Sequence, residues 1–446
     1  MKLRNNLRTS FLNRFLRQAL WLSMVLLIHH GTARVARATS LCVYVPVDIE
    51  DRILDTTAFP RARPIRDLES GGVSYMAARG MWGRLERWTG SAWTDVVAWG
   101  HIPNNGCFLF TVFGTTTKYR VSIKSYGQGI RTSGVNHFLV HPPGSRNGFN
   151  TYTKEFNGNL GVGGIINALM SNFVLPRIYA IMAYMEGNFV SGGAAGWQLH
   201  VNNVTDADIV CSSGTPETAD SLFCVDENGE LRIRLRDDPS ALARFGSKHA
   251  YLMVHEYGHA QRVISGLALG VTNWGAGGDY NNTTSRGGCV ATVNSHEITS
   301  EEWQSAAASE GWAHFVATDA WTIHPTTDSN PVGWMNLYYN ETVVSAETGE
   351  FTVFRDHYCL DQCLCSDLGH GVELDWLRQF WDYHTNNQSG DGDYRDHAEL
   401  RNDLALSTPW DREDTFYSFQ DRLATGPGLR WSRFGSSSGT ATGRVD

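Results

Sequence analysis

The chain lacks a second long apolar run beyond its first 38 residues, so no later segment is expected to anchor it in a membrane. Those first 38 residues lack any acidic side chain, yet they carry seven basic residues and enclose the apolar run Ala19–Ile28. This layout is typical of a secretory signal peptide, and Ala36-Arg37-Ala38 supplies the small residues that a signal peptidase needs. We therefore expect a signal peptide over 1–38 and a secreted or periplasmic protein that begins near Thr39. The alternative is a retained amphipathic helix.

The charge balance excludes some classes of partner. Seven of the 37 basic residues lie in the leader, which leaves 30 basic against 46 acidic side chains. A net charge near −16 disfavours nucleic acid and anionic membrane surfaces as partners. No internal repeat is visible, and about 400 residues exceed the usual size of a single domain, so two domains are expected.

All eight cysteines lie beyond the leader, and in an exported chain an even number predicts disulfide bonds. We expect Cys42 to pair with Cys107 and Cys211 with Cys224. The cluster Cys359, Cys363 and Cys365 could instead hold a structural zinc ion, but thiols rarely stay reduced after export.

Residues 39–146 alternate short strand patterns with turns. Tyr119, Val121 and Ile123 alternate with polar neighbours, as in a half-buried strand, and Asn104-Asn105-Gly106 has turn chemistry. These patterns predict a β-sandwich domain. Its tryptophans could bind carbohydrate, but aromatic residues on alternating strands favour the core: Trp82, Trp88, Trp93 and Trp99.

A polar linker over 141–148 separates this region from a second predicted domain over 149–434, and 435–446 is expected to be a flexible tail. The spacing of apolar residues predicts helices over 165–173, 178–185, 300–321 and 372–381, and a further helix after residue 247. Two strand candidates, 197–201 and 231–235, predict a small sheet. The expected fold class is therefore α+β, with an N-terminal β-sandwich followed by a mainly helical domain.

One helix carries the sequence His255-Glu256-Tyr257-Gly258-His259. Two histidines four residues apart project from one helical face and can bind one metal ion. Glu256 is offset around the helix, where a carboxylate can reach a water molecule on the metal without being a ligand. A chance His-Glu-x-x-His is expected only about 0.03 times in a chain of this composition, so the motif is specific. The alternative is a pair of surface histidines.

A zinc site of this kind needs a third protein ligand. A metzincin would have glycine and histidine where this chain has Arg262 and Ser265, which excludes that branch. Glu310 is the favoured ligand, because it lies in a helical segment of small residues that permits close approach. Glu301 and Glu302 are the alternatives, although both have the character of an acidic helix start.

At residues 251–262 and 309–317 the chain resembles the gluzincin branch of the zincin metallopeptidases, the thermolysin-like arrangement. The resemblance implies Zn²⁺ held by His255, His259 and Glu310, with Glu256 as general base, in a zincin-like metallopeptidase domain that acts on a protein or peptide substrate. Two departures stand out. The gap between the second histidine and the ligand glutamate is long, and His314 replaces the aspartate that such enzymes tend to have four residues after that glutamate.

The reaction also needs a donor to the developing oxyanion. His370, in a glycine turn before a helix, is the first choice, and Tyr338, Tyr339 and His357 are alternatives. Asp391, Asp393 and Asp396 fit only part of a calcium loop and favour a solvated turn.

The sequence therefore predicts a secreted zinc-dependent metallopeptidase. Two rival interpretations remain open. One is a zinc-bearing binding module without turnover. The other is a secreted carbohydrate-binding or adhesive protein that acts through its tryptophan-rich N-terminal region.

Overall fold

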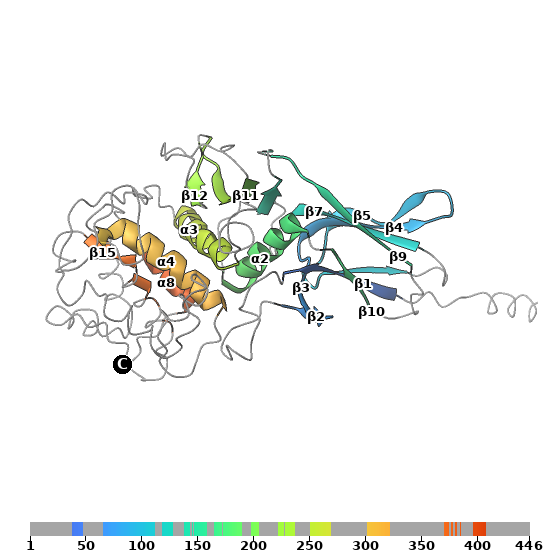
Figure 1. Ribbon diagram of the computed structural model, residues 1–446, viewed down its shortest axis with the longest axis horizontal. Helices are drawn as coiled ribbons and strands as arrows, with labels where there is room; N and C mark the ends of the chain where they lie inside the picture. Colours follow the sequence, from blue (N-terminus) through green and yellow to red (C-terminus); the bar gives the residue numbers. More distant parts are fainter. Residues whose placement is uncertain are drawn as a thin grey trace, which may run out of the picture.

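The computed structural model describes residues 38–47, 66–111, 118–127, 138–142, 145, 147–157, 165–171, 173–189, 198–204, 222–226, 228–236, 250–268, 301–321, 370–373, 376–377, 380, 384 and 396–406. Most strands of two large mixed sheets lie toward one end of the molecule and most of the described helices toward the other, with helix α2 between them and the last strands of the second sheet close to helix α3 (Figure 1).

The first sheet has five strands in the order β10-β1-β3-β2, with β6 also paired to β1. Its members are β1 (Ala38–Pro46), β2 (Leu68–Ser70), β3 (Val73–Ala77), β6 (Cys107–Thr111) and β10 (Ile165–Leu169). Strand β1 runs parallel to β10 on one side and antiparallel to β6 and β3 on the other. At the turn that leads into β6, Gly106 has φ +75°, and a Cβ on it would lie 2.6 Å from the Cβ of Ala77. Only glycine fits this turn without strain.

The second sheet has eight strands in the order β12-β13-β11-β8-β7-β4-β5, with β9 also paired to β7. Its members are β4 (Met81–Trp88), β5 (Trp93–His101), β7 (Lys118–Gly127), β8 (Phe138–His141), β9 (Thr151–Asn157), β11 (Leu199–Val204), β12 (Leu222–Val225) and β13 (Leu231–Arg236). The predicted strand forms as β7, and Tyr119, Val121 and Ile123 are all buried, but Ser122 between them is buried as well, so the expected half-exposed alternation holds only in part. The sheet combines strands from both sides of the polar segment at 141–148.

Four described helices pack against these sheets or against one another. They are α2 (Val174–Phe189), α3 (Ala250–Ala268), α4 (Gln304–Trp321) and α8 (His397–Ala405). Pro176 lies in the first turn of α2, where its missing N–H is not needed. Helix α2 contacts strands of both sheets, and α3 contacts β12, β13, α4 and α8. A two-stranded sheet of β14 (Glu301–Trp303) and β15 (His370–Val372) lies against α4.

The fold-class prediction of a mainly helical second domain with a small sheet is wrong. Among the interpretable residues, strands account for 46% and helices for 34%, in two large mixed sheets with four helices. Residues 165–169 show why, because their apolar spacing resembles a helix although they form β10 beside β1. A short apolar run fits a buried strand as well as a helix, and here a distant partner decides between them.

The expectation that the four N-terminal tryptophans belong to the core is also wrong. All four are half-buried and lie on strands β4 and β5. Cationic side chains cover two of the rings: the Arg84 guanidinium lies 4.9 Å from the Trp99 centroid, and that of Arg120 lies 4.6 Å from Trp93. These cation–π contacts stabilise an aromatic surface that the core leaves partly open.

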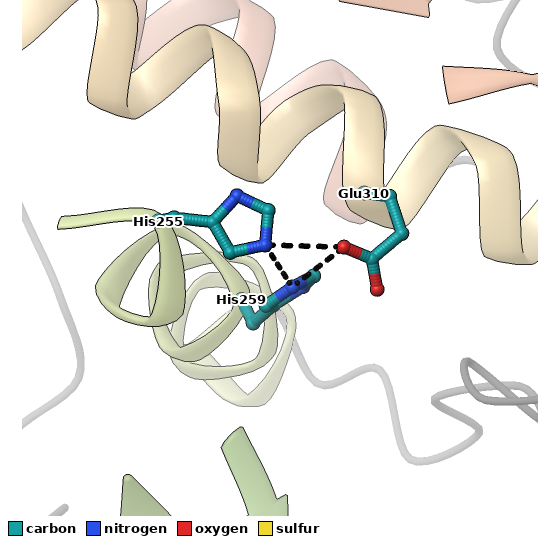
Figure 2. Close-up of side chains that lie close together, drawn as sticks. All are labelled: His255, His259 and Glu310. Atoms are coloured by element: carbon teal, nitrogen blue, oxygen red, sulfur yellow. Dashed lines mark hydrogen bonds and ion pairs between the residues drawn. The ribbon is translucent and has the colours of Figure 1, made fainter. Parts of the chain in front are cut away.

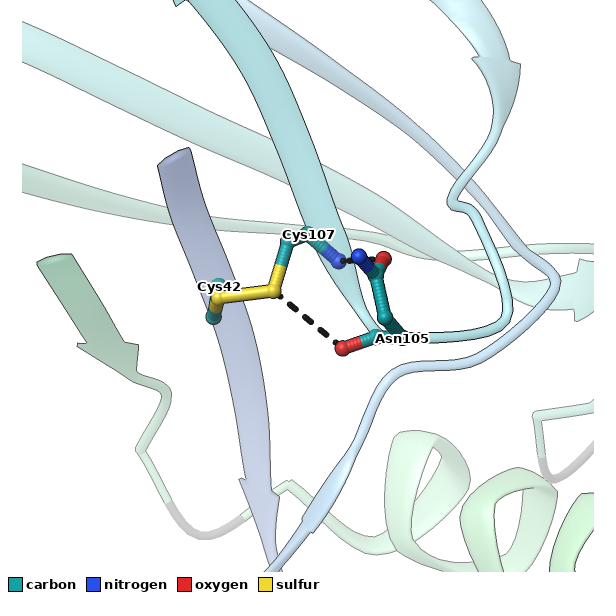
Figure 3. The surroundings of a disulfide bond; sticks show 3 residues. All are labelled: Cys42, Asn105 and Cys107. Atoms are coloured by element: carbon teal, nitrogen blue, oxygen red, sulfur yellow. Dashed lines mark hydrogen bonds between the residues drawn. A yellow bond between two sulfur atoms is a disulfide. The ribbon is translucent and has the colours of Figure 1, made fainter. Parts of the chain in front are cut away.

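The predicted Cys42–Cys107 disulfide is confirmed and joins β1 to β6 at a directly paired position (Figure 3). Cys224 is also disulfide-bonded. Its expected partner Cys211 lies outside the described residues, as do Cys359, Cys363 and Cys365, residues 1–37 of the proposed leader and the proposed tail.

Candidate metal centre

Helix α3, which contains the His-Glu-x-x-His motif, is buried in the interior of the protein. Its apolar side chains are buried, namely Met253, Val254, Tyr257, Ala260, Val263 and Ile264. His255, Glu256 and His259 are buried too, with exposed fractions of 7%, 4% and 8%. Because a buried imidazole or carboxylate is costly without a polar partner, this helix must face other polar groups.

Small residues allow α4 to approach α3 closely. The first half of α4 contains Ala306, Ala307, Ala308, Ser309 and Gly311. On α3 the matching residue is Gly258, where an added Cβ would lie 2.8 Å from the Cα of Ala313. The contact therefore has room for hydrogen but not for a methyl group, and it places Glu310 beside both histidines.

The structure brings His255, His259 and Glu310 together in one buried cluster (Figure 2). The Nε2 atoms of the two histidines are 3.2 Å apart, and they lie 3.1 Å and 3.2 Å from Oε2 of Glu310. Donor atoms bound at about 2.0–2.1 Å to a tetrahedral ion lie roughly 3.3–3.4 Å apart. The three donors therefore have nearly the spacing that a tetrahedral metal ion requires, and the cluster could hold one.

Burial and the shared Glu310 carboxylate shift the pKa values of His255 and His259 in opposite directions. Burial lowers the pKa of His255 to about 3, and His314 acts in the same direction. Burial also acts to lower the pKa of His259, but the Glu310 carboxylate outweighs it, and the pKa of His259 is raised. Without a metal, burial favours the neutral form of His255, whereas the Glu310 carboxylate favours a proton on His259, which a metal ion on that nitrogen would have to displace.

Further polar side chains support the cluster from behind. Nδ1 of His259 lies 3.1 Å from Oγ of Ser309. The ring of His314, one turn after Glu310 on α4, lies 4.3 Å from the ring of His255 between centroids. Nε2 of His314 lies 3.3 Å from Oε2 of Glu373, which is 1% exposed.

The other predicted site residues have different outcomes. Glu256 is buried on α3 beside the cluster but is not one of its three members. The backbone of His370 lies in β15 and pairs with Trp303 of β14. Strand β15 contacts α4. The side chain of His370 lies outside what the structure describes. Glu301 and Glu302 lie in β14, before the helix that carries Glu310. Tyr338, Tyr339 and His357 lie outside the described residues.

Sequence reasoning missed a second buried polar network behind the cluster. Asp319 of α4 lies 3.2 Å from Nδ1 of His397 and 3.5 Å from Nε2 of His384, and Nε2 of His397 lies 3.3 Å from Oε1 of Gln261 on α3. The only signal in the sequence was a buried acid within an apolar helix, nine residues after Glu310. Burial lowers the pKa of His397 despite Asp319, which keeps that imidazole neutral.

Asp396, considered above as part of a calcium loop, has a structural role instead. It is the N-cap of α8: its side chain accepts a hydrogen bond from the backbone N–H of Glu399, and the Glu399 carboxylate accepts one from the N–H of Asp396. This reciprocal pair is a capping box, and it fixes the start of the helix that carries His397.

Two further observations concern the setting of the protein. The Cys42–Cys107 disulfide is consistent with an exported protein. Among the helices of the described residues, none is both long enough and apolar enough to cross a membrane. Comparison with protein families, with curated proteins and with solved structures finds no match to this chain, so its own cluster of His255, His259 and Glu310 carries the functional argument.

Proposed function

We propose that the protein is a secreted zinc-dependent metallopeptidase, with zinc held by His255, His259 and Glu310. The observation that supports this proposal is the buried cluster of two Nε2 atoms and one carboxylate oxygen at 3.1–3.2 Å. Two imidazoles and one carboxylate are the ligand set of catalytic zinc sites that keep a fourth position for water. When bound, the ion supplies a Lewis acid that lowers the pKa of a water molecule to about 7.

Glu256 is the proposed general base. It follows one ligand directly and precedes the other by three residues, so its side chain leaves the helix at an angle to the ligand face. It is buried beside the cluster without belonging to it. A carboxylate held there can accept the proton of the attacking water and pass it to the leaving amine.

His370 is the proposed donor to the oxyanion. Its strand β15 packs against α4, the helix that carries Glu310. Replacement by Ala should lower turnover without loss of metal.

Replacing Glu256 with Gln separates chemistry from metal binding. Glutamine keeps the volume and most of the hydrogen bonding but cannot accept the proton, so we expect a folded, zinc-loaded protein with peptide hydrolysis reduced by about 10²–10⁴. Zinc content by atomic spectroscopy and cleavage of a broad peptide library measure the two properties. The matched control is Glu155→Gln on the exposed part of β9. Cleavage by Glu256→Gln at the wild-type rate would refute the mechanism.

The tryptophans of β4 and β5 are half-buried, so their partly exposed rings favour a second candidate function, carbohydrate binding. Arg84, Arg120 and Lys124 already lie over rings of this surface. Binding of polysaccharides by the full chain, lost on Trp88→Ala, together with zinc content but no hydrolysis of any peptide, would select this function over the peptidase.

A further inference from the structure

The second ring nitrogen of each histidine ligand needs a partner of its own. A metal ion on Nε2 of a neutral imidazole leaves the proton on Nδ1, which becomes a buried hydrogen-bond donor. Nδ1 of His259 meets the Ser309 hydroxyl. Nδ1 of His255 has no hydrogen-bond partner among the described residues, although it is buried. Figure 2 shows that this nitrogen points away from the cluster toward α4.

His314 is a further polar side chain whose ring contacts that imidazole. It projects from α4 one turn after Glu310 and is buried, and its ring meets that of His255 at an interplanar angle of 54°. An imidazole can be either donor or acceptor at each nitrogen, so what His314 offers depends on which of its own nitrogens carries the proton.

Glu373 decides that choice. Its carboxylate oxygen lies 3.3 Å from Nε2 of His314, and an ionised carboxylate only accepts hydrogen bonds. The proton of a neutral His314 therefore lies on Nε2, and Nδ1 is left as the acceptor nitrogen. Gly311 keeps Glu373 close to α4, because a Cβ on this glycine would lie 2.7 Å from the Glu373 carbonyl oxygen and 2.3 Å from the Cβ of Trp376.

We propose that Glu373 and His314 form a positioning relay for the metal ligand His255, in which Nδ1 of His314 accepts the Nδ1–H of His255 once Nε2 binds the metal. This inference rests on the proposed zinc site. The two rings are already in contact, with their centroids 4.3 Å apart, and the hydrogen bond forms when the rings move so that their Nδ1 atoms face each other. The relay orients the ligand imidazole and raises its basicity, so its members act on metal affinity rather than on the substrate.

Two isosteric substitutions test which nitrogen of residue 314 matters. In His314→Asn the side-chain oxygen takes approximately the place of Nδ1, whereas in His314→Gln the amide takes approximately the place of Nε2. We expect His314→Asn to keep zinc affinity within a few-fold of wild type and His314→Gln to lose about 10–100-fold. Competition of the full-length oxidised protein with a chromogenic zinc chelator measures the affinity, independently of any peptidase activity.

Glu373→Gln completes the design. Its amide can donate to Nε2 of His314 and move the proton of that ring to Nδ1, so zinc affinity should fall as much as in His314→Gln. Equal affinity in wild type, His314→Gln and Glu373→Gln would overturn the relay, as would an equal loss in the Asn and Gln variants of His314, which indicates packing alone. A wild-type protein that binds no zinc, or binds zinc and cleaves no peptide, overturns the proposed function and is recognised before any variant is compared.

Discussion

At the scale of single residues, the cluster depends on one glycine as much as on its ligands. Gly258 lies inside the His-Glu-x-x-His motif and faces Ala313 and Val316 of α4. A side chain there would separate the two helices, and the carboxylate of Glu310 reaches the histidines only because the helices touch. The motif therefore specifies a helix contact as well as two ligands.

Gly258→Ala should destabilise the protein and weaken metal binding together. The new Cβ would lie 2.8 Å from a backbone atom that cannot rotate away, and overpacking of this kind costs about 1–3 kcal/mol. Urea unfolding and the zinc competition assay measure the two effects. Gly100→Ala is the control, because its Cβ would meet only the carbonyl oxygen of Ala98 at 3.8 Å. A Gly258→Ala protein as stable as the control would contradict the close contact.

The opposite pKa directions of the two histidines predict how zinc affinity depends on pH. His259 has a raised pKa, so its proton stabilises the metal-free fold at low pH, and that contribution is lost as pH rises through the folded pKa. Zinc must displace this proton. The stabilisation by zinc should therefore grow with pH, with affinity rising about tenfold per pH unit for one displaced proton. Thermal unfolding with and without zinc, from mildly acidic to neutral pH, measures the stabilisation by zinc. If the difference in unfolding temperature with and without zinc does not change with pH, no proton is displaced.

At the scale of elements, local patterns could be predicted from the sequence and distant contacts could not. Helix α3 follows from its own apolar spacing, and Glu310 from the small residues around it. Glu373 and His397 gave no such signal, because each acts through a residue far away in the chain. The prediction of a helix at β10 is wrong for the same reason, because only the pairing with β1 distinguishes this strand from a helix.

The capping box of α8 offers a test at this scale. Asp396→Ala removes the acceptor for the Glu399 N–H and should lower the free energy of unfolding by about 1 kcal/mol. Asp396→Ser, which retains an oxygen at the N-cap, should recover most of the loss. Chemical denaturation of the two variants gives the comparison. Equal stability of wild type and Asp396→Ala would show that the cap is not formed in solution.

At the scale of the whole molecule, strand β1, which carries Cys42, lies toward one end and helix α4, which carries Glu310, toward the other (Figure 1). Cys42 and Cys107 are separated by 65 residues, and a cross-link over such a loop removes about 4 kcal/mol of chain entropy from the unfolded state. The double variant Cys42→Ser, Cys107→Ser should therefore unfold at a lower urea concentration but bind zinc with unchanged affinity. Ser40→Ala on the same strand serves as the control. Loss of zinc binding in the double variant would mean that the two ends are coupled.

The pairing of β1 also has a consequence for the order in which the chain folds. Its neighbours β6 and β10 lie far along the sequence, so the first sheet is complete only once residues 165–169 have been synthesised, and the second only once residues 231–236 have been added. Contacts at such separation close slowly. A chain released at residue 146 would carry unpaired edges on β1, β7 and β8, which favour aggregation. We therefore expect the fragment 39–146 to be insoluble where a fragment extended through residue 236, which contains every strand of both sheets, is soluble, as sedimentation after refolding would show.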